Sequence, residues 1–199
     1  MRYHLPKIIV TAILLMLAVP ARAADVRVCL TPGENCTAII VSAIDGARRS
    51  LLVQQYELTS PELAGAIIRA HQRGVAVRVL LDRRVTRYSD ASVLVREGIP
   101  VAIDSGITGI AHNKIAILDG ETVIGGSFNW TQSAQKRNAE NVLVIRDAPL
   151  ASRMTANFDL RASGSRPYTG VQSAASGSTR GKPVCGLPGH RRCRVTHGL

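Results

Sequence analysis

The sequence predicts an α/β fold with a mixed, largely parallel β-sheet that is flanked by helices on both faces. Between residues 26 and 103, short apolar runs alternate with amphipathic segments, an order that favours parallel strands joined by helical crossovers. Asp119-Gly120 separates two strand-like runs and is typical of a β-hairpin, which adds antiparallel pairing. The chain has 199 residues, of which 46% are hydrophobic, so it can bury one core.

The elements of the first half are predicted from hydrophobic periodicity and from capping residues. Apolar side chains recur at helical spacing in residues 37–49, and Ser60 followed by Pro61 opens a helix that stops before Gly74. Gly98 ends a third helix, and apolar runs too short to be helices lie between the three. The expected order is strand 26–30, turn 31–33, helix 37–49, strand 50–56, helix 61–73, strand 75–81, helix 89–97 and strand 99–103.

The second half differs because a tight turn joins its strands. Residues 112–118 and 122–125 form the expected hairpin, residues 141–145 another strand and residues 149–160 a closing helix. From residue 161 the chain is rich in Ser, Gly, Arg, Pro and Thr, a composition that buries too little apolar surface to fold alone. We therefore expect a signal peptide at 1–23, one domain at 24–160 and a flexible basic tail at 161–199.

Residues 1–23 have the three parts of a secretory signal peptide. Arg2 and Lys7 precede an apolar run at 8–19, and Ala21-Arg22-Ala23 offers a cleavage site. The run is shorter than the roughly 20 apolar residues of a stable membrane span. Cleavage is therefore expected to leave no membrane span and to give a periplasmic or secreted protein, and an uncut membrane anchor is the alternative.

Four cysteines follow the signal, and an even number in an oxidising compartment favours disulfides. The short spacings suggest that Cys29 pairs with Cys36 and Cys185 with Cys193, among three pairings that four cysteines allow. A zinc site formed with the C-terminal histidines is the alternative, although the sequence has no C-x-x-C pair.

The net charge of +11 comes from the two ends of the chain. Three Lys or Arg residues lie in 1–23 and seven in 161–199, which leaves 15 for residues 24–160, where all 14 acids lie. A basic tail attracts nucleic acid or an anionic membrane surface. The alternative is a solvated tail that only keeps the protein soluble.

Residues 111–145 hold the groups that carry chemistry. His112 and Lys114 are two residues apart on an expected strand, so both side chains should project from one face, where a basic pair meets a phosphate. The hairpin returns Ser127 and Asn129 to the same edge, and Gly125-Gly126 lets the backbone approach a ligand. An imidazole, an ammonium, a hydroxyl and an amide are the groups needed to attack phosphorus and to hold its oxygens.

These residues resemble a known signature. His112-x-Lys114-x4-Asp119 with Gly126-Ser127-x-Asn129 resembles the motif of the phospholipase D superfamily, and residues 136–141 resemble its continuation in the small, single-motif secreted endonucleases of bacteria. The likeness runs from about residue 31 to residue 160 and includes Tyr56 with Thr59-Ser60-Pro61 and Arg73-Gly74-Val75.

The resemblance implies a two-step displacement. His112 attacks phosphorus and forms a phosphohistidine, while a second histidine protonates the leaving oxygen and then activates water. Since the chain has one such motif, the second histidine is expected to be His112 of the partner subunit in a homodimer with a shared active site. Glu140 is expected to orient the imidazole, and Lys114, Ser127 and Asn129 to bind phosphate oxygens.

The expectation also covers the roles of three further residues and the question of whether a cofactor is required. Asp119 belongs to the motif, and its place at the turn favours a structural role over proton transfer. Trp130 is a candidate to stack on a nucleic acid base or to pack in the core, and Phe128 is expected in the core. No metal or other cofactor is required, because Lys114 and a protonated imidazole supply positive charge.

The expected function is therefore a metal-independent phosphodiesterase, a non-specific endonuclease that cleaves DNA or RNA through backbone phosphates. The first alternative is a phospholipase D-type lipid phosphodiesterase, which would need an exposed apolar entry or a membrane-binding helix that the sequence does not show. The second alternative is a non-catalytic binder of nucleic acid or of the cell envelope, in which the motif is vestigial.

Overall fold

The computed structural model describes residues 24–84 and 86–170, and these ranges contain eight strands, five α-helices and one 3₁₀ turn. In chain order the elements are β1 (Asp25–Thr31), α2 (Cys36–Gly46), β2 (Ser50–Gln55), α3 (Pro61–Gln72), β3 (Ala76–Asp82), the 3₁₀ turn Thr86–Tyr88, α4 (Ala91–Arg96), β4 (Val101–Asp104), β5 (Lys114–Leu118), β6 (Thr122–Gly126), α5 (Gln132–Lys136), β7 (Glu140–Arg146), α6 (Ala148–Ser163) and β8 (Arg166–Pro167).

All eight strands form one sheet in the order β1-β7-β6-β5-β2-β3-β4-β8. The parallel pairings join β2 to β3 and β3 to β4, the strands that α3 and α4 connect. The other five described pairings are antiparallel. The mixed α/β sheet is confirmed, but its expected largely parallel character is wrong, because β5, β6 and β7 follow one another antiparallel and β1 pairs with β7.

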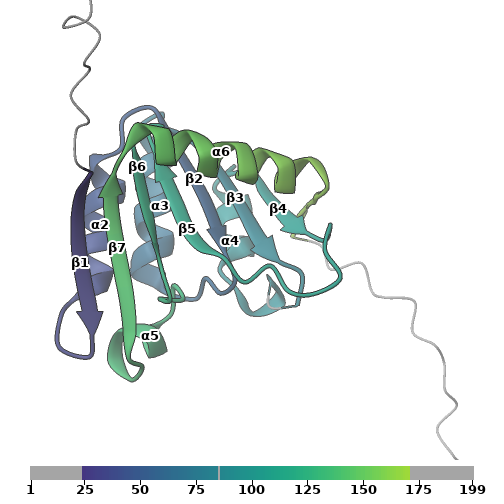
Figure 1. The fold of residues 1–199 in the computed structure, drawn as a ribbon. Coiled ribbons are helices and arrows are strands. Elements are labelled where there is room, and N and C mark those ends of the chain that lie inside the picture. The colour runs from purple at the N-terminus through teal and green to yellow at the C-terminus, as the bar shows by residue number, and fades with distance from the viewer. Residues whose placement is uncertain (1–23, 85, 171–199) are drawn as a thin grey trace, which may run out of the picture.

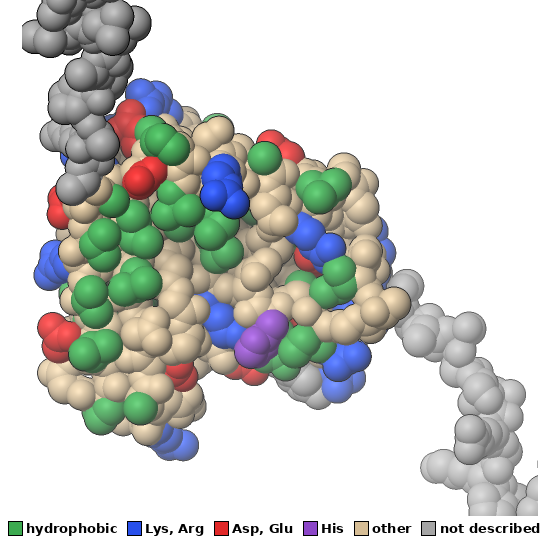
Figure 2. Space-filling view, viewed as in Figure 1, with side chains coloured by type: hydrophobic (Ala, Val, Ile, Leu, Met, Phe, Trp, Pro, Cys, Tyr) green, Lys and Arg blue, Asp and Glu red, His purple; other side chains and the backbone are tan. Residues whose placement is uncertain are grey.

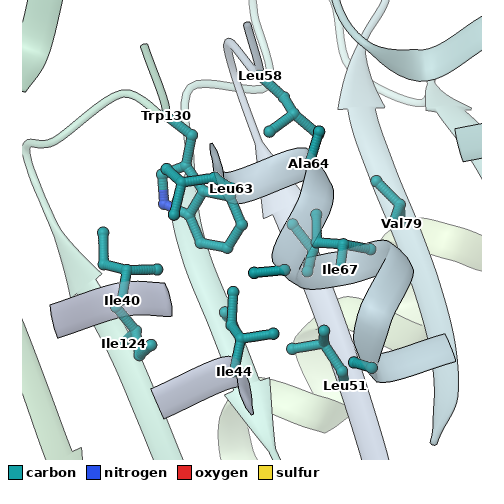
Figure 3. Packing of buried hydrophobic residues seen from close by; sticks show 14 of the residues in the cluster. Ile40, Ile44, Leu51, Leu58, Leu63, Ala64, Ile67, Val79, Ile124 and Trp130 are labelled. Carbon is teal, nitrogen blue, oxygen red and sulfur yellow. The ribbon is translucent and has the colours of Figure 1, made fainter. Parts of the chain in front are cut away.

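Helices cover both faces of the sheet, as the sequence predicts. Figure 1 shows α2, α3 and α4 on one face and α6 across the other. Figure 3 shows the larger core, where side chains of α2 and α3 meet Trp130, which follows β6; its members include Ile40, Ile44, Leu63, Ile67, Ile124 and Trp130. The smaller core lies under α6 and contains Leu80, Ile117, Val123, Ala151 and Phe158.

The folded body continues past residue 160, where the sequence suggested a boundary. α6 extends to Ser163, β8 pairs with β4, and the backbone N–H of Tyr168 donates to the carbonyl of Val101 at 2.8 Å. Arg161 donates to both carboxylate oxygens of Asp104, at 2.9 and 2.5 Å, and the Asp104 side chain is fully buried. An arginine assigned to the basic tail therefore belongs to an ion pair of the fold.

β1 leaves three apolar side chains exposed. Val26, Val28 and Leu30 are 48%, 50% and 53% exposed. Val26 pairs with Ile145, which pairs with Val123 under α6, so these side chains share the α6 face of the sheet. α6 packs mainly against the central strands. Figure 2 shows hydrophobic side chains gathered over β1 and β7 on this face.

Cys29 and Cys36 form a disulfide with their Cα atoms 5.7 Å apart, which confirms the pairing suggested by their spacing. It ties the end of β1 to the first residue of α2. The signal peptide, the Cys185 and Cys193 pairing and the zinc alternative all concern residues outside the described ranges. Within those ranges, no helix is long and apolar enough to cross a membrane.

We predict that removing one partner of the Arg161 and Asp104 ion pair lowers the unfolding free energy strongly, whereas replacing both partners lowers it little. Arg161→Met leaves a buried carboxylate without its partner and should cost about 3–5 kcal/mol of unfolding free energy, measured by urea denaturation. The double variant Arg161→Met with Asp104→Val removes both charges and should recover most of that loss. A cost below about 1 kcal/mol for Arg161→Met would mean that the pair behaves like a solvent-exposed one.

Candidate active site

His112 and Lys114 lie at the start of β5 but in different environments. β5 begins at Lys114, and His112 precedes it in an irregular segment, its backbone N–H donating to the carbonyl of Ile110 at 3.1 Å. The His112 side chain is exposed, whereas Lys114 is 9% exposed. The two residues are joined directly, because Lys114 Nζ donates to the His112 carbonyl oxygen at 2.8 Å. His112 therefore lies just outside the strand in which the sequence placed it, with an exposed imidazole, while Lys114 is a buried ammonium at the first position of β5.

Burial sets the electrostatics of Lys114. It lowers the pKa of the ammonium below its ordinary value, and the carboxylates of Glu140 and Glu57 oppose that shift. A cation removed from water interacts more strongly with a nearby anion, since the local dielectric is lower. The site is therefore suited to hold a negatively charged group beside Lys114.

Tyr56 contacts both basic residues. It follows β2 directly, and its ring centroid lies 4.6 Å from that of His112 at an interplanar angle of 64°. Lys114 Nζ lies over the same ring, 5.3 Å from its centroid. Sequence analysis gave Tyr56 no role, although its place after a buried strand, at the sheet edge reached by His112, was a usable signal.

The exit of β6 brings the second half of the motif to the site. Gly126 has φ +138°, and a Cβ at this position would overlap the carbonyl oxygen of Asn141, so only glycine fits. This close approach sets Ser127 against β7. Its hydroxyl donates to Glu140 Oε2 at 2.5 Å and accepts from the N–H of Asn141 at 3.0 Å.

Ser127 and Glu140 therefore have partners that the sequence did not predict. A serine hydroxyl has one proton, and that of Ser127 is directed at Glu140 rather than at a ligand. Glu140 also accepts from Asn138 Nδ2 at 2.9 Å. In the described chain Glu140 makes no hydrogen bond to the His112 imidazole, so the expected orientation of His112 by Glu140 is not formed within one protomer.

Asn129 is linked to Lys114 through a carboxylate that sequence analysis missed. Asn129 Nδ2 donates to Glu57 Oε2 at 3.2 Å, and the negative charge of Glu57 also raises the pKa of Lys114. One N–H of the Asn129 amide stays available. Its Oδ1 is buried without a hydrogen-bond partner among the described residues. The structure thus gathers His112, Lys114 and Asn129 at one edge of the sheet, with Ser127 and Glu140 beside them.

Asp82 is a further residue that sequence analysis missed. Its carboxylate is 1% exposed and accepts the backbone N–H of Ala111 and that of Arg84, each at 2.7 Å. It therefore ties the end of β3 to the residue that precedes His112. The signal was an acid at the end of a buried strand, where side chains of neighbouring parallel strands meet.

Asp119 lies at the opposite end of β5 from Lys114, so the structure gives it no contact with the site. It adopts φ +56° in the hairpin turn. Its carboxylate accepts the backbone N–H groups of Arg48, Arg49 and Ser50 at 2.7–3.2 Å. Partial burial raises its pKa, but these donors outweigh that effect and hold the pKa below its ordinary value. Asp119 anchors the hairpin, and its place among the catalytic candidates is corrected.

The aromatic candidates pack inside. Trp130 is 1% exposed and Phe128 is 2% exposed, both in the larger core. The core assignment of Phe128 is confirmed, and Trp130 as a base contact is wrong, because its backbone pairs with Leu58 and draws the indole under α3. No group of three or more His, Cys, Asp or Glu side chains in the described residues is placed to hold a metal ion.

The chain is similar to known proteins in both sequence and structure. A family model described as "Cardiolipin synthase, PLD-like domain" matches residues 40–161. A phospholipase D from Rickettsia bellii is 45% identical over 135 residues, 67% of either chain. A mitochondrial cardiolipin hydrolase from Canis lupus familiaris is 38% identical over 126 residues, 62% of this chain and 49% of that protein. The crystal structure of Nuc from Salmonella typhimurium, a phospholipase D family member, has a TM-score of 0.69 at 32% identity and covers 73% of this chain and 99% of its own.

We predict that Asp119 contributes stability without contributing to activity. Asp119→Asn keeps a residue that tolerates positive φ but removes the charge, and should lower the unfolding free energy at pH 7 by about 1–2 kcal/mol. Because the folded pKa lies below the ordinary value of about 3.9, the stabilisation is present above that pH and disappears as pH falls through the folded pKa. Urea denaturation of both proteins should show their difference shrinking below about pH 4.

The activity of Asp119→Asn provides the control. A folded variant should keep wild-type turnover, since Asp119 is separated from His112 by the whole of β5. Loss of turnover with unchanged stability would contradict a structural role.

Proposed function

Because this chain belongs to the phospholipase D-like family, we propose that it is an exported endonuclease that cleaves nucleic acid at backbone phosphates without a metal ion. The protein is a phosphodiesterase of this superfamily, as the family match and its 45% identical relative indicate. The observation that carries the proposed metal-free attack on phosphorus is the buried ammonium of Lys114, which donates to the backbone carbonyl of the exposed His112.

In the proposed first step, an imidazole nitrogen of His112 attacks phosphorus. A P–N bond forms and the P–O bond to the leaving nucleotide breaks, while a second, protonated imidazole gives its proton to the leaving oxygen. In the second step that imidazole removes a proton from water, whose oxygen attacks phosphorus. The P–N bond breaks, the strand that now ends in a phosphate group is released, and His112 is restored.

Lys114 and Asn129 stabilise the charge on the phosphate oxygens. Lys114 uses one of its three N–H groups on the His112 carbonyl, which leaves two for the phosphate. Asn129 adds one N–H, because Glu57 takes the other. Preorganised donors of this kind, held in a partly desolvated site, are each worth about 10²–10³-fold in turnover. Ser127 and Glu140 serve this site by holding the ends of β6 and β7 together.

The second imidazole is proposed to come from another copy of the chain. Besides His112, the described residues contain His71, which lies near the C-terminal end of α3, beside Gly98. The other end of α3 is the one bonded to the site loop, through Ser60 and Trp130. A helix of 12 residues spans about 18 Å, so His71 is too distant to take part. The exposed apolar side chains of β1 offer contact surface to a second copy.

Lipid hydrolysis is a second candidate, favoured by the names of the relatives, phospholipase D and mitochondrial cardiolipin hydrolase. The same groups act on either phosphodiester, so the attacking chemistry does not separate the two substrates. Nucleic acid is preferred here because the resemblance of residues 136–141 is to the endonuclease branch. The exported basic tail would add long-range attraction to a polyanion.

We predict that the purified protein converts supercoiled plasmid to nicked plasmid in the presence of EDTA. His112→Ala removes the nucleophile and should lower the nicking rate by about 10³-fold or more, and Lys114→Ala by about 10²–10³-fold. His71→Ala is the matched control and should keep wild-type activity. Loss of wild-type nicking in EDTA would contradict metal independence.

The same preparations should be given vesicles that contain cardiolipin, with release of phosphatidic acid as the readout. Nicking without lipid turnover supports the endonuclease. Lipid turnover without nicking would contradict the endonuclease proposal and support lipid hydrolysis.

A further inference from the structure

We infer that Tyr56 is a positioning residue for both basic groups of the site, fixing the ring plane of His112 and the ammonium of Lys114 at once. This inference rests on the proposed function, since it assigns Tyr56 a part in the same reaction. Neither the motif nor the comparisons give this residue a role.

The backbone of Tyr56 is locked to the segment that it would position. Gln55 and Lys114 are partners in the antiparallel pairing of β2 and β5. The pairing continues one residue beyond β2, because the N–H of Tyr56 donates to the carbonyl of Asn113 at 2.8 Å. Asn113 lies between His112 and Lys114, so a shift of Tyr56 cannot occur independently of either one.

The ring of Tyr56 supplies the contact that orients the imidazole. The two rings meet edge to face, with centroids 4.6 Å apart and planes at 64°, a preferred geometry for aromatic pairs. In the described residues no hydrogen bond reaches either imidazole nitrogen, and Glu140 is engaged by Ser127 and Asn138. A histidine nucleophile is commonly oriented by a carboxylate. Here the aromatic contact takes that task and leaves both nitrogens open to substrate and to a second imidazole.

The same ring also holds Lys114. Its ammonium lies 5.3 Å from the ring centroid, within the range at which the negative face of an aromatic ring attracts a cation. Such contacts are stronger when the cation is desolvated, and Lys114 is 9% exposed. The remaining N–H groups are then restricted in direction, which presents them to a phosphate in one arrangement. The ring acts through its face, so the phenolic hydroxyl is not needed.

The test compares Tyr56→Phe, Tyr56→Leu and Tyr56→Met with wild type in the plasmid assay in EDTA. Phe keeps the ring and should stay within about twofold of wild-type kcat. Leu and Met remove the ring and should lower kcat by about 10- to 100-fold, with KM changed by less than about threefold, as for misplaced reacting groups. Met is included as an unbranched side chain in case Leu does not fold. Tyr168→Leu, a partly buried tyrosine of the β8 segment, is the matched control and should keep activity.

A spectroscopic readout separates positioning from general packing. In ¹H–¹³C NMR spectra, the carbon-bound imidazole protons of His112, identified by their absence in His112→Ala, should carry a ring-current shift in wild type and Tyr56→Phe. The shift should be absent in Tyr56→Leu and Tyr56→Met. Unchanged His112 signals in the ringless variants, full activity of those variants, or equal loss of activity in Tyr56→Phe would each overturn the inference. An inactive wild type whose His112 signal still responds to Tyr56 would instead count against the proposed function.

Discussion

The burial of one ammonium group constrains the whole site. Removing a lysine charge from water costs several kcal/mol unless partners compensate, and Lys114 is almost fully buried at the start of β5. Its compensation comes from four directions: the His112 carbonyl, the Tyr56 ring, and the carboxylates of Glu140 and Glu57. These groups belong to the ends of β2 and β7 and to the segment before β5. The charge is therefore compensated only when the strands of the sheet have their observed order, which couples the site to the fold.

Local signals in the sequence predicted what local physics determines. The Asp119-Gly120 turn, the Ser60-Pro61 helix start and the short disulfide are encoded within a few residues, and all are present. Strand pairing is decided by contacts between residues far apart in the sequence, so hydrophobic periodicity could not predict that β1 pairs with β7. The sheet was therefore expected to be more parallel than it is. The end of α6 was missed for the same reason, because the partner of Arg161 is Asp104, 57 residues away.

The candidate site shows the same division. The spacing of His112 and Lys114 predicted that they act together, but a periodic strand pattern could not show that β5 starts only at Lys114. Glu140 was expected to orient His112 on the basis of its residue type alone. In the structure, the close approach that Gly126 permits places Ser127 where its hydroxyl donates to Glu140. Trp130 has polar neighbours in sequence, and its burial depends on a pairing with Leu58 from the other half of the chain. Tyr56 was part of the family likeness but received no role, because its contacts with His112 and Lys114 arise only when β2 and β5 pair.

One catalytic centre is proposed to need the imidazoles of two chains. Wild-type protein should be mixed with His112→Ala at one part to three, subunits allowed to exchange, and nicking measured per wild-type subunit. If a centre uses both imidazoles, only dimers of two wild-type chains are active, and activity per wild-type subunit falls to about one quarter by random pairing. Unchanged activity per wild-type subunit after demonstrated exchange would mean that each chain is catalytically complete, which would contradict a shared catalytic centre.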